Sequence, residues 1–120
     1  MDPSRISSLV EHFPEIKHFR ALEASFEFRV GLLTTPVRAR VWLNPEYPEP
    51  YEFEVSHQIH TPSRGGPYGT SAPFASSVED AVQRVTSGIL SFYSGAIQDG
   101  HTPAESWLVP NPSWAHDPFA

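Results

Sequence analysis

The residues of this chain best suited to chemistry lie between Val55 and Phe74, in the stretch VSHQIHTPSRGGPYGTSAPF. Two imidazoles can share a metal ion, and an imidazole beside a hydroxyl can move a proton. His57 and His60 are three residues apart in an alternating segment, where successive side chains point to opposite faces of a strand. We therefore expect no metal site at this pair. His57 should lie in the core or at the sheet end, and His60 on the surface.

Catalytic templates are missing from the rest of the sequence. It contains no GxSxG and no HExxH motif, and without cysteine it has neither a thiol nucleophile nor a thiolate metal site. The paired carboxylates of Glu79 and Asp80 fall in the first turn of an expected helix, where acidic groups favour the helix dipole. We expect a protein that is not an enzyme and needs no cofactor. A catalytic or metal site around His57 and Tyr68 is the alternative.

The connection from Thr61 to Ala75 has no periodicity and is longer than most connections in small domains. Its glycines allow motion, while Arg64 and Tyr68 supply groups that can bind a partner. The segment RGGPYG lacks the GxxxxGK[ST] pattern of a phosphate-binding loop. We predict that this loop is part of a binding surface, and the alternative is a mobile connector.

The chain is acidic, with 14 Asp and Glu against 8 Lys and Arg and a net charge of −6. Nucleic-acid-binding proteins normally carry a basic face, so direct binding to nucleic acid is not expected. The segment NPEYPEPYEFE brings together Glu46, Glu49, Glu52 and Glu54 without a basic residue among them. It is either a solvated turn and strand edge or a negative patch that attracts a basic partner.

Three segments alternate between apolar and polar residues, as strands with one buried face do. They are ASFEFRVGLL, PVRARVWLN and YEFEVSHQIH, and the third places residues 51, 53, 55, 57 and 59 on one face. We expect a three-stranded antiparallel sheet, with Glu27, Arg40 and Glu54 as a charge ladder on its solvated face. Trp42 is a large apolar side chain on that polar face, where we expect it to contact a partner.

Two segments have apolar residues at helical spacing. Residues 1–13 begin with Asp2 as a cap and Pro3 in the first turn, and one face carries Ile6, Leu9, Val10 and Phe13. Residues 76–100 form the longer segment, whose apolar stripe faces the sheet. We therefore expect one helix before the strands and one after them.

The start and end of the second helix are marked by capping residues. Ser76 and Glu79 fit a capping box, and Gly100 should end the helix. Gly88 and Gly95 lie close to the apolar stripe, where glycine costs about 1 kcal/mol. We expect both to permit close packing against the sheet or the first helix.

The order of the elements is helix, three strands, helix. This order resembles that of double-stranded-RNA-binding domains, which carry a basic cluster at the start of the last helix. Here that position reads SSVEDAVQR, so RNA binding is not expected. We expect an α+β domain over residues 1–100 and a Pro- and Trp-rich C-terminal arm over residues 101–120, packed on the domain or on a partner.

These observations favour a small acidic protein-binding module without enzymatic activity. We expect an inhibitor or antagonist, of the immunity or phage anti-defence type, that occupies a basic surface of another protein such as a nucleic-acid-binding complex. The expected contact residues are Trp42, Glu46, Glu49, Glu52, Arg64 and Tyr68. The alternative is an assembly subunit that self-associates through its arm. Neither a signal peptide nor an apolar run long enough to span a membrane is evident, so the expected location is the cytoplasm.

Overall fold

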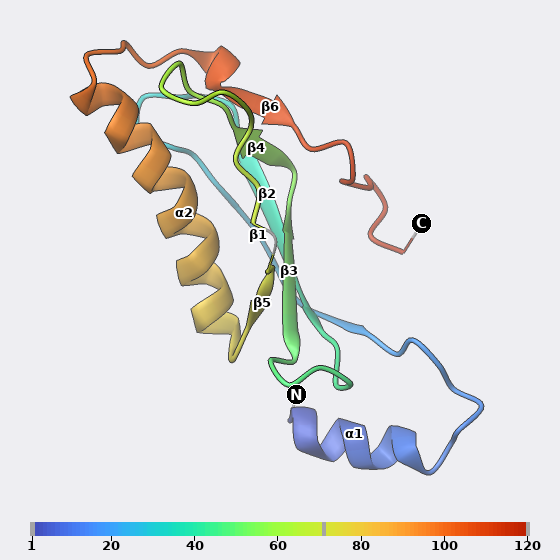
Figure 1. Ribbon diagram of the computed structural model, residues 1–120. Helices are drawn as coiled ribbons and strands as arrows, with labels where there is room; N and C mark the ends of the chain where they lie inside the picture. The colour runs from blue at the N-terminus through green and yellow to red at the C-terminus, as the bar shows by residue number, and fades with distance from the viewer. Residues whose placement is uncertain (1, 71, 120) are drawn as a thin grey trace.

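The protein has two α-helices and an antiparallel sheet of four strands, in the order β1-β2-β3-β5 (Figure 1). A computed structural model describes residues 2–70 and 72–119. Its helices are α1 (Pro3–Glu11), α2 (Val78–Gln98) and the 3₁₀ turn η1 (Glu105–Trp107). Its strands are β1 (Ala21–Phe28), β2 (Val37–Leu43), β3 (Tyr51–Val55), β4 (His57–Ile59), β5 (Phe74–Ala75) and β6 (Leu108–Pro110).

The α+β class and the antiparallel sheet agree with the sequence, but the prediction of three strands is wrong. The end of the long loop forms β5, in which Phe74 pairs with Glu52 and Ala75 with Tyr51. The amide of Phe53 also donates to the carbonyl oxygen of Pro73 at 2.9 Å. Two residues are too few to show an alternating pattern, so only the folded chain reveals this edge strand.

The segment predicted as one strand over residues 51–60 is broken at Ser56. The amide of Ser56 donates to the carbonyl oxygen of Arg38, and its hydroxyl accepts from the amide of Arg38, both at 2.8 Å. Beyond this point β4 leaves the sheet and pairs with β6 of the C-terminal arm in a separate two-stranded sheet. The chain therefore leaves the main sheet after β3 because β4 pairs with β6, a segment that is distant in the sequence.

The register of the main sheet joins only part of the predicted charge ladder. Arg40 lies opposite Glu54, as expected, but Glu27 lies opposite Arg38. The residue of β1 opposite Arg40 is Ser25, in a register that includes a bulge between Leu22 and Ala24. The prediction of a single Glu27–Arg40–Glu54 ladder is therefore wrong by two residues at β1.

Helix α2 covers one face of the sheet, and the arm that follows β6 lies on the other side (Figure 1). The residues of β2 that face α2 are almost completely buried, and Ala81 and Val85 of the helix pack against this face. A second cluster at the far end of α2 joins Ile89, Tyr93 and Trp107. The apolar core thus lies between α2 and the sheet, as the helical stripe predicted.

The start of α2 differs by one residue from the prediction. Ser77, and not Ser76, is the N-cap: its hydroxyl accepts from the amide of Asp80 at 3.0 Å, and a carboxylate oxygen of Asp80 accepts from the amide of Ser76 at 3.0 Å. At the other end Gly100 adopts a positive φ of 90°, and the amide of His101 donates to the carbonyl oxygen of Ala96. Gly100 thus follows the helix end, as expected.

Helix α1 lies beyond one end of the sheet and has no buried residue (Figure 1). Its N-cap is the predicted one, because the Asp2 carboxylate accepts from the amides of Ser4 and Arg5. The molecule is elongated, with dimensions of 56 × 25 × 23 Å. In the described part of the chain, no helix is long and apolar enough to cross a lipid bilayer.

Candidate functional site

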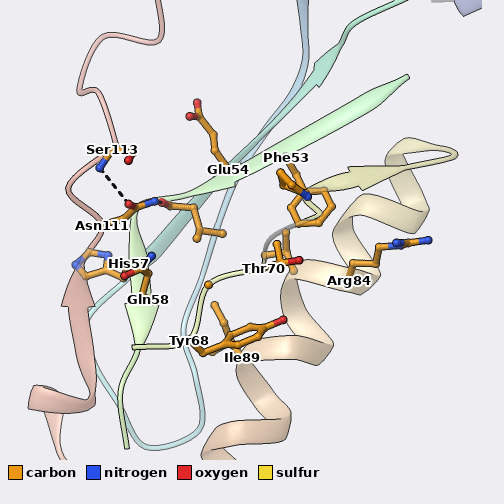
Figure 2. A pocket seen from close by; sticks show the side chains of 14 residues that line it. Phe53, Glu54, His57, Gln58, Tyr68, Thr70, Arg84, Ile89, Asn111 and Ser113 are labelled. Carbon is orange, nitrogen blue, oxygen red and sulfur yellow. Dashed lines mark hydrogen bonds between the residues drawn. The ribbon is translucent and has the colours of Figure 1, made fainter. Parts of the chain in front are cut away.

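A cavity of about 320 Å³ lies where β3 loses its neighbour β5 and the long loop passes over α2 (Figure 2). Its apolar wall includes Phe53 of β3 and Ile89 of α2, and its polar lining includes His57, Gln58 and Asn111. This volume is at the lower end of the range for small-molecule pockets. The cavity brings together two residues of the predicted catalytic alternative, His57 and Tyr68, from β4 and the loop.

Tyr68 fastens the long loop to the domain. Its amide donates to the carbonyl oxygen of Ile59 at 2.7 Å, and its ring lies 4.3 Å from the ring of Phe92 on α2. A methyl group at Gly88 would come within 3.1 Å of the Tyr68 hydroxyl, which explains a glycine in the middle of this helix. The close neighbour of Gly88 is thus the loop, and not the sheet or the first helix as predicted. Gly95 has no neighbour within 4 Å of an added methyl group, so the prediction of a packing reason is wrong there.

Arg64 lies on the outer side of the same aromatic pair. Its guanidinium carbon is 4.4 Å from the centre of the Phe92 ring, a cation–π contact that leaves the residue exposed. A second tie joins the loop to the end of α2, where the Ser63 hydroxyl donates to the Asp99 carboxylate at 2.6 Å. The predicted contact residues Arg64 and Tyr68 are therefore close together, on the C-terminal half of α2.

The ring of His57 contacts a neighbouring hydroxyl group. Its Nδ1 lies 2.8 Å from the hydroxyl of Ser56, and this hydroxyl already accepts from the amide of Arg38. The Ser56 proton is therefore available to Nδ1, which fits a neutral imidazole. Burial lowers the pKa of His57, which disfavours the charged ring.

Acidification should destabilise the protein through His57. Because its pKa is lower in the folded chain, the unfolded chain binds this proton more readily. The contribution is intact above pH 6.5, the usual value for histidine, and is lost as the pH falls below it. Urea unfolding at pH 7.5 and pH 5.5 should show a smaller pH-dependent loss for His57→Gln than for the unmodified chain. His60→Gln is the control, and an equal loss in all three proteins would contradict the prediction.

Arg84 lies at the opposite end of the cavity from His57 (Figure 2). Its guanidinium contacts the Asp80 carboxylate at 3.1 Å and the Glu49 carboxylate at 3.5 Å. The Ser76 amide and the Arg84 side chain both lower the pKa of Asp80, so this carboxylate stays charged beside Arg84. Two carboxylates therefore compete with any acidic ligand for this cation.

Metal-ligand geometry is not found in the described residues. Within residues 2–70 and 72–119, no three His, Asp or Glu side chains lie close enough together to hold a metal ion. His60 lies after β4, and its Nε2 is 3.2 Å from the carbonyl oxygen of Arg64. The two histidines of the opening stretch thus have separate local partners.

The acidic run does not form one continuous patch. Glu46 and Glu49 lie in the exposed turn between β2 and β3, and Glu49 pairs with Arg84 on the α2 side. Glu52 and Glu54 project from β3 on the side of the arm, where Glu54 accepts from the indole of Trp42 at 3.1 Å. The four carboxylates are therefore divided between the turn and one face of β3, which Glu52 and Glu54 share because they are two residues apart in a strand.

Trp42 lies under the C-terminal arm and is only 1% exposed. The ring of Phe119 meets it edge-on at 5.3 Å, and the guanidinium of Arg20 lies 4.0 Å from its centre. A partner could contact this indole only after the arm leaves the sheet. The six predicted contact residues therefore fall in three places: Glu46 and Glu49 in the turn, Arg64 and Tyr68 on the loop over α2, and Trp42 and Glu52 on the face of the sheet on the side of the arm.

An exposed apolar surface that was not predicted from the sequence is formed by α1 and the segment after it. Leu9, Phe13 and Ile16 are 54%, 59% and 54% exposed. They line a groove of about 230 Å³ whose walls are entirely apolar, and which we call the N-terminal groove: Ile6, Leu9, Val10, Phe13, Ile16 and Phe19. The amphipathic pattern of α1 was visible in the sequence, but it did not show that this face stays uncovered.

Helix α1 adjoins the acidic turn, residues 44–50, through a different face from the one that forms the N-terminal groove. Pro3 and Ser7 of α1 share a shallow depression with Tyr47 of this turn. Tyr47 is itself 43% exposed, and its ring packs on Phe74 at 5.1 Å. One end of the molecule thus combines an exposed apolar groove with the exposed carboxylates of the turn.

Glu105 is a second feature that the sequence did not reveal. Its carboxylate accepts hydrogen bonds at 2.9–3.2 Å from the amides and hydroxyls of Thr34 and Thr35. The two Thr amides are the main cause of a lowered pKa for Glu105. This carboxylate closes the β1–β2 connection onto the start of the arm, so its role is structural.

No family model matches the chain, no curated protein is similar to it, and no solved structure matches its fold. The cavity under Tyr68 is lined by Glu54, His57 and Arg84 among others, and the Arg84 guanidinium is already engaged by the carboxylates of Asp80 and Glu49. The N-terminal groove has the clearest chemical character, because it exposes the large apolar side chains of Leu9, Phe13 and Ile16 to water. It is therefore the stronger candidate for a functional site.

Proposed function

We propose that this protein is a protein-binding module that acts by occupying a partner's surface, and that it binds through the N-terminal groove and the acidic turn. The observation that carries the proposal is the exposure of Leu9, Phe13 and Ile16, each above one half. Large contiguous apolar patches on soluble proteins commonly mark interaction sites. An amphipathic helix with an uncovered apolar face is also a common ligand for hydrophobic grooves.

The apolar side chains at this surface can supply part of the energy of binding, and the polar and charged contacts around them supply the rest. Fully burying a Leu, Ile or Phe side chain contributes about 1.5–3 kcal/mol. Three side chains that are still about half exposed therefore retain roughly 2–4 kcal/mol, to which Tyr47 can add. The helix is already formed and capped by Asp2, so little ordering entropy opposes the contact.

Charge complementarity favours a basic partner. Glu46 and Glu49 lie in the exposed turn beside α1, and burial together with the carboxylates of Glu23, Asp2 and Glu79 raises the pKa of Tyr51 nearby. Several negative charges therefore gather at this end of the sheet. A surface that uses Lys and Arg around an apolar groove, as nucleic-acid-binding proteins can offer, would fit it. This chemistry supports an inhibitor or antagonist role.

Disrupting the groove should abolish the interaction. The double variant Leu9→Glu/Phe13→Glu places two carboxylates where apolar side chains would be buried, and we expect at least a 100-fold weaker Kd. The partner would first be identified by nuclease-treated pull-down from host lysate, and Kd then measured by calorimetry. Leu90→Glu is the matched control, because Leu90 is 53% exposed on the outer face of α2. Equal affinity of the double variant and the control would contradict the proposal.

Reversing the acidic turn should weaken binding by a separate route. Glu46→Lys/Glu49→Lys should slow association and reduce the dependence of Kd on salt, because fewer favourable charge pairs form. Glu52→Lys can be added to this pair to include the carboxylate on the other side. The control is Glu27→Lys/Asp117→Lys, which changes the net charge equally at exposed sites elsewhere. An unchanged salt dependence would exclude electrostatic recognition by the acidic turn, but it would not contradict binding through the N-terminal groove.

The alternative role, assembly through the C-terminal arm, needs the arm to act between chains. In this structure the arm lies on its own sheet, with the Arg40 guanidinium donating to the carbonyl oxygens of Ala115 and His116. Self-association through the arm would require these contacts to form on another copy. That requirement leads to a specific inference about the arm.

A further inference from the structure

The last part of the arm, residues 111–119, is held on the sheet mainly by three side chains. Arg40 and Trp42 belong to β2, and Arg20 lies directly before β1. Arg40 donates to the carbonyl oxygens of Ala115 and His116 at 2.8 and 3.0 Å, and its guanidinium lies 3.8 Å from the Trp114 ring. Trp42 packs on Phe119, and Arg20 donates to the carbonyl oxygen of Pro118 at 3.3 Å. These contacts use backbone carbonyls and rings, not a strand ladder.

The surface under this segment is polar and separate from the apolar core. Arg40 is 6% exposed and is accompanied by Glu54 at 3.4 Å, whereas the core residues of β2 point towards α2. Phe119 remains 67% exposed even when it is docked. Opening residues 111–119 would therefore expose Arg40 and Trp42 but would leave the core closed, so this segment belongs to the least stable part of the fold.

A turn at residues 111–114 connects the docked segment to β6. The Trp114 amide donates to the carbonyl oxygen of Asn111 at 3.0 Å, and the Ser113 amide donates to the Asn111 side-chain oxygen at 3.1 Å. Pro112 occupies the second position, which suits either a turn or an extended chain. The chain before the turn is fixed, since Trp107 and Leu108 are buried in the core. The turn is therefore the natural hinge.

We propose that the turn at residues 111–114 can open, and that the segment after it then docks on the Arg40–Trp42 face of a second copy of this chain. A second copy is the occupant that the contacts favour, because its arm has the same carbonyls and rings that already fit this face. Two chains that exchange arms keep every docking contact and lose only the bonds of the turn. Mutual exchange gives a two-fold symmetric dimer, in which the Arg40–Trp42 face of each chain is covered by the arm of the other chain.

Shortening the hinge tests the proposal. Deleting Pro112 and Ser113 prevents the arm from turning back onto its own sheet, whereas an extended hinge can still cross to another copy. We expect light scattering to give twice the chain mass of 13.4 kDa, within the small change made by the deletion. Inserting two glycines at the same place is the control and should remain a monomer. A deletion variant that folds as a monomer would overturn the proposal.

A complementation experiment checks that the arms themselves are exchanged. In the shortened background, Arg40→Ala removes the docking face of one chain and Trp114→Ala weakens the arm of the other. Each chain alone should dimerise at least 10-fold more weakly than the shortened parent. Mixing them should recover dimer, because the intact arm of the first chain meets the intact face of the second. No gain on mixing would show that the arms do not cross.

Dimerisation through the N-terminal groove would also double the mass, and a further variant distinguishes it from arm exchange. Adding Leu9→Glu/Phe13→Glu to the shortened chain should leave the exchanged dimer intact; a return to monomer would assign the contact to the groove and overturn arm exchange. If the shortened chain does not fold, the unmodified chain is refolded over a concentration series. A dimer fraction that rises with concentration and is absent from the glycine-inserted control supports the proposal, and monomer throughout overturns it.

Discussion

Replacing Arg40 by alanine should lower the free energy of unfolding by about 3 kcal/mol and release the C-terminal arm. The guanidinium contributes two hydrogen bonds to carbonyl oxygens, a contact with the Glu54 carboxylate and a cation–π contact with Trp114. Charge-assisted hydrogen bonds contribute about 1.5–3 kcal/mol, and cation–π contacts about 0.5–2 kcal/mol. The estimate is below their sum because Glu54, 33% exposed, can be rehydrated once the arm leaves.

Arg38→Ala is the matched control for this experiment. Arg38 is on the same strand, but its side chain is 57% exposed and it contacts only the exposed Glu27 carboxylate, at 3.8 Å. Pairs of this kind contribute about 0–1 kcal/mol. Urea unfolding measures the stability of both variants, and tryptophan fluorescence reports the release of Trp114 and Trp42. A loss below about 1 kcal/mol for Arg40→Ala would mean that the arm does not depend on this side chain.

Gly31→Ala should also destabilise the fold by about 3 kcal/mol. Gly31 has a φ of +51°, where a side chain costs about 1–2 kcal/mol. A methyl group there would lie only 2.3 Å from ring atoms of Tyr93, and overpacking of this kind costs about 1–3 kcal/mol. Tyr93 cannot move freely, since its hydroxyl accepts from the Leu32 amide at 3.0 Å and its ring packs on Trp107.

Gly100→Ala separates the two causes of this loss. Gly100 also has a positive φ, of 90°, but no atom lies within 4 Å of a methyl group built there. It should therefore show only the backbone cost, about 1 kcal/mol. The midpoints of urea unfolding, at equal m-values, give the comparison. Equal losses at the two glycines would indicate that Tyr93 yields without cost and that its packing is loose.

Both predictions depend on how the C-terminal arm is attached to the rest of the domain. Tyr93 and Trp107 hold the beginning of the arm in the core, while Arg40 holds its end on the outer face of the sheet. Between them the arm supplies β6, which pairs with β4 and ends β3. The rigid body that results carries α1 at one end without burying it, which is the arrangement expected of a scaffold that displays a binding element.

The helices and strands could be predicted because their signals are local. Asp2 caps α1, and the apolar stripe of α2 faces the core, since both follow from spacing along a few turns. The fourth strand could not be predicted from two residues, and the break at Ser56 needed the β6 segment as a partner. Capping moved from Ser76 to Ser77 because either serine can serve and only the packed helix selects one.

The candidate site could be predicted from the sequence less completely than the fold. Arg64 and Tyr68 were rightly placed on the long loop, but the loop is fastened on Phe92, which the sequence did not associate with it. Trp42 lies on the polar face of the sheet, as its strand position required, yet the arm buries it. Exposure depends on which distant segment covers a residue, and alternation within a strand carries no information about that.

The sequence by itself determined the two main helices, most of the first three strands, the acidic charge and the absence of cysteine chemistry, because these depend on composition and on contacts between near neighbours. Only the tertiary structure decided which of two amphipathic helices would be buried. Both α1 and α2 have an apolar face, but α2 buries its face along the sheet, whereas α1 contacts the core cluster through Ile6 and has no buried residue. One apolar face of the sheet takes one long helix, and the arm occupies the other face through Arg40. The groove along α1 remains exposed for this reason.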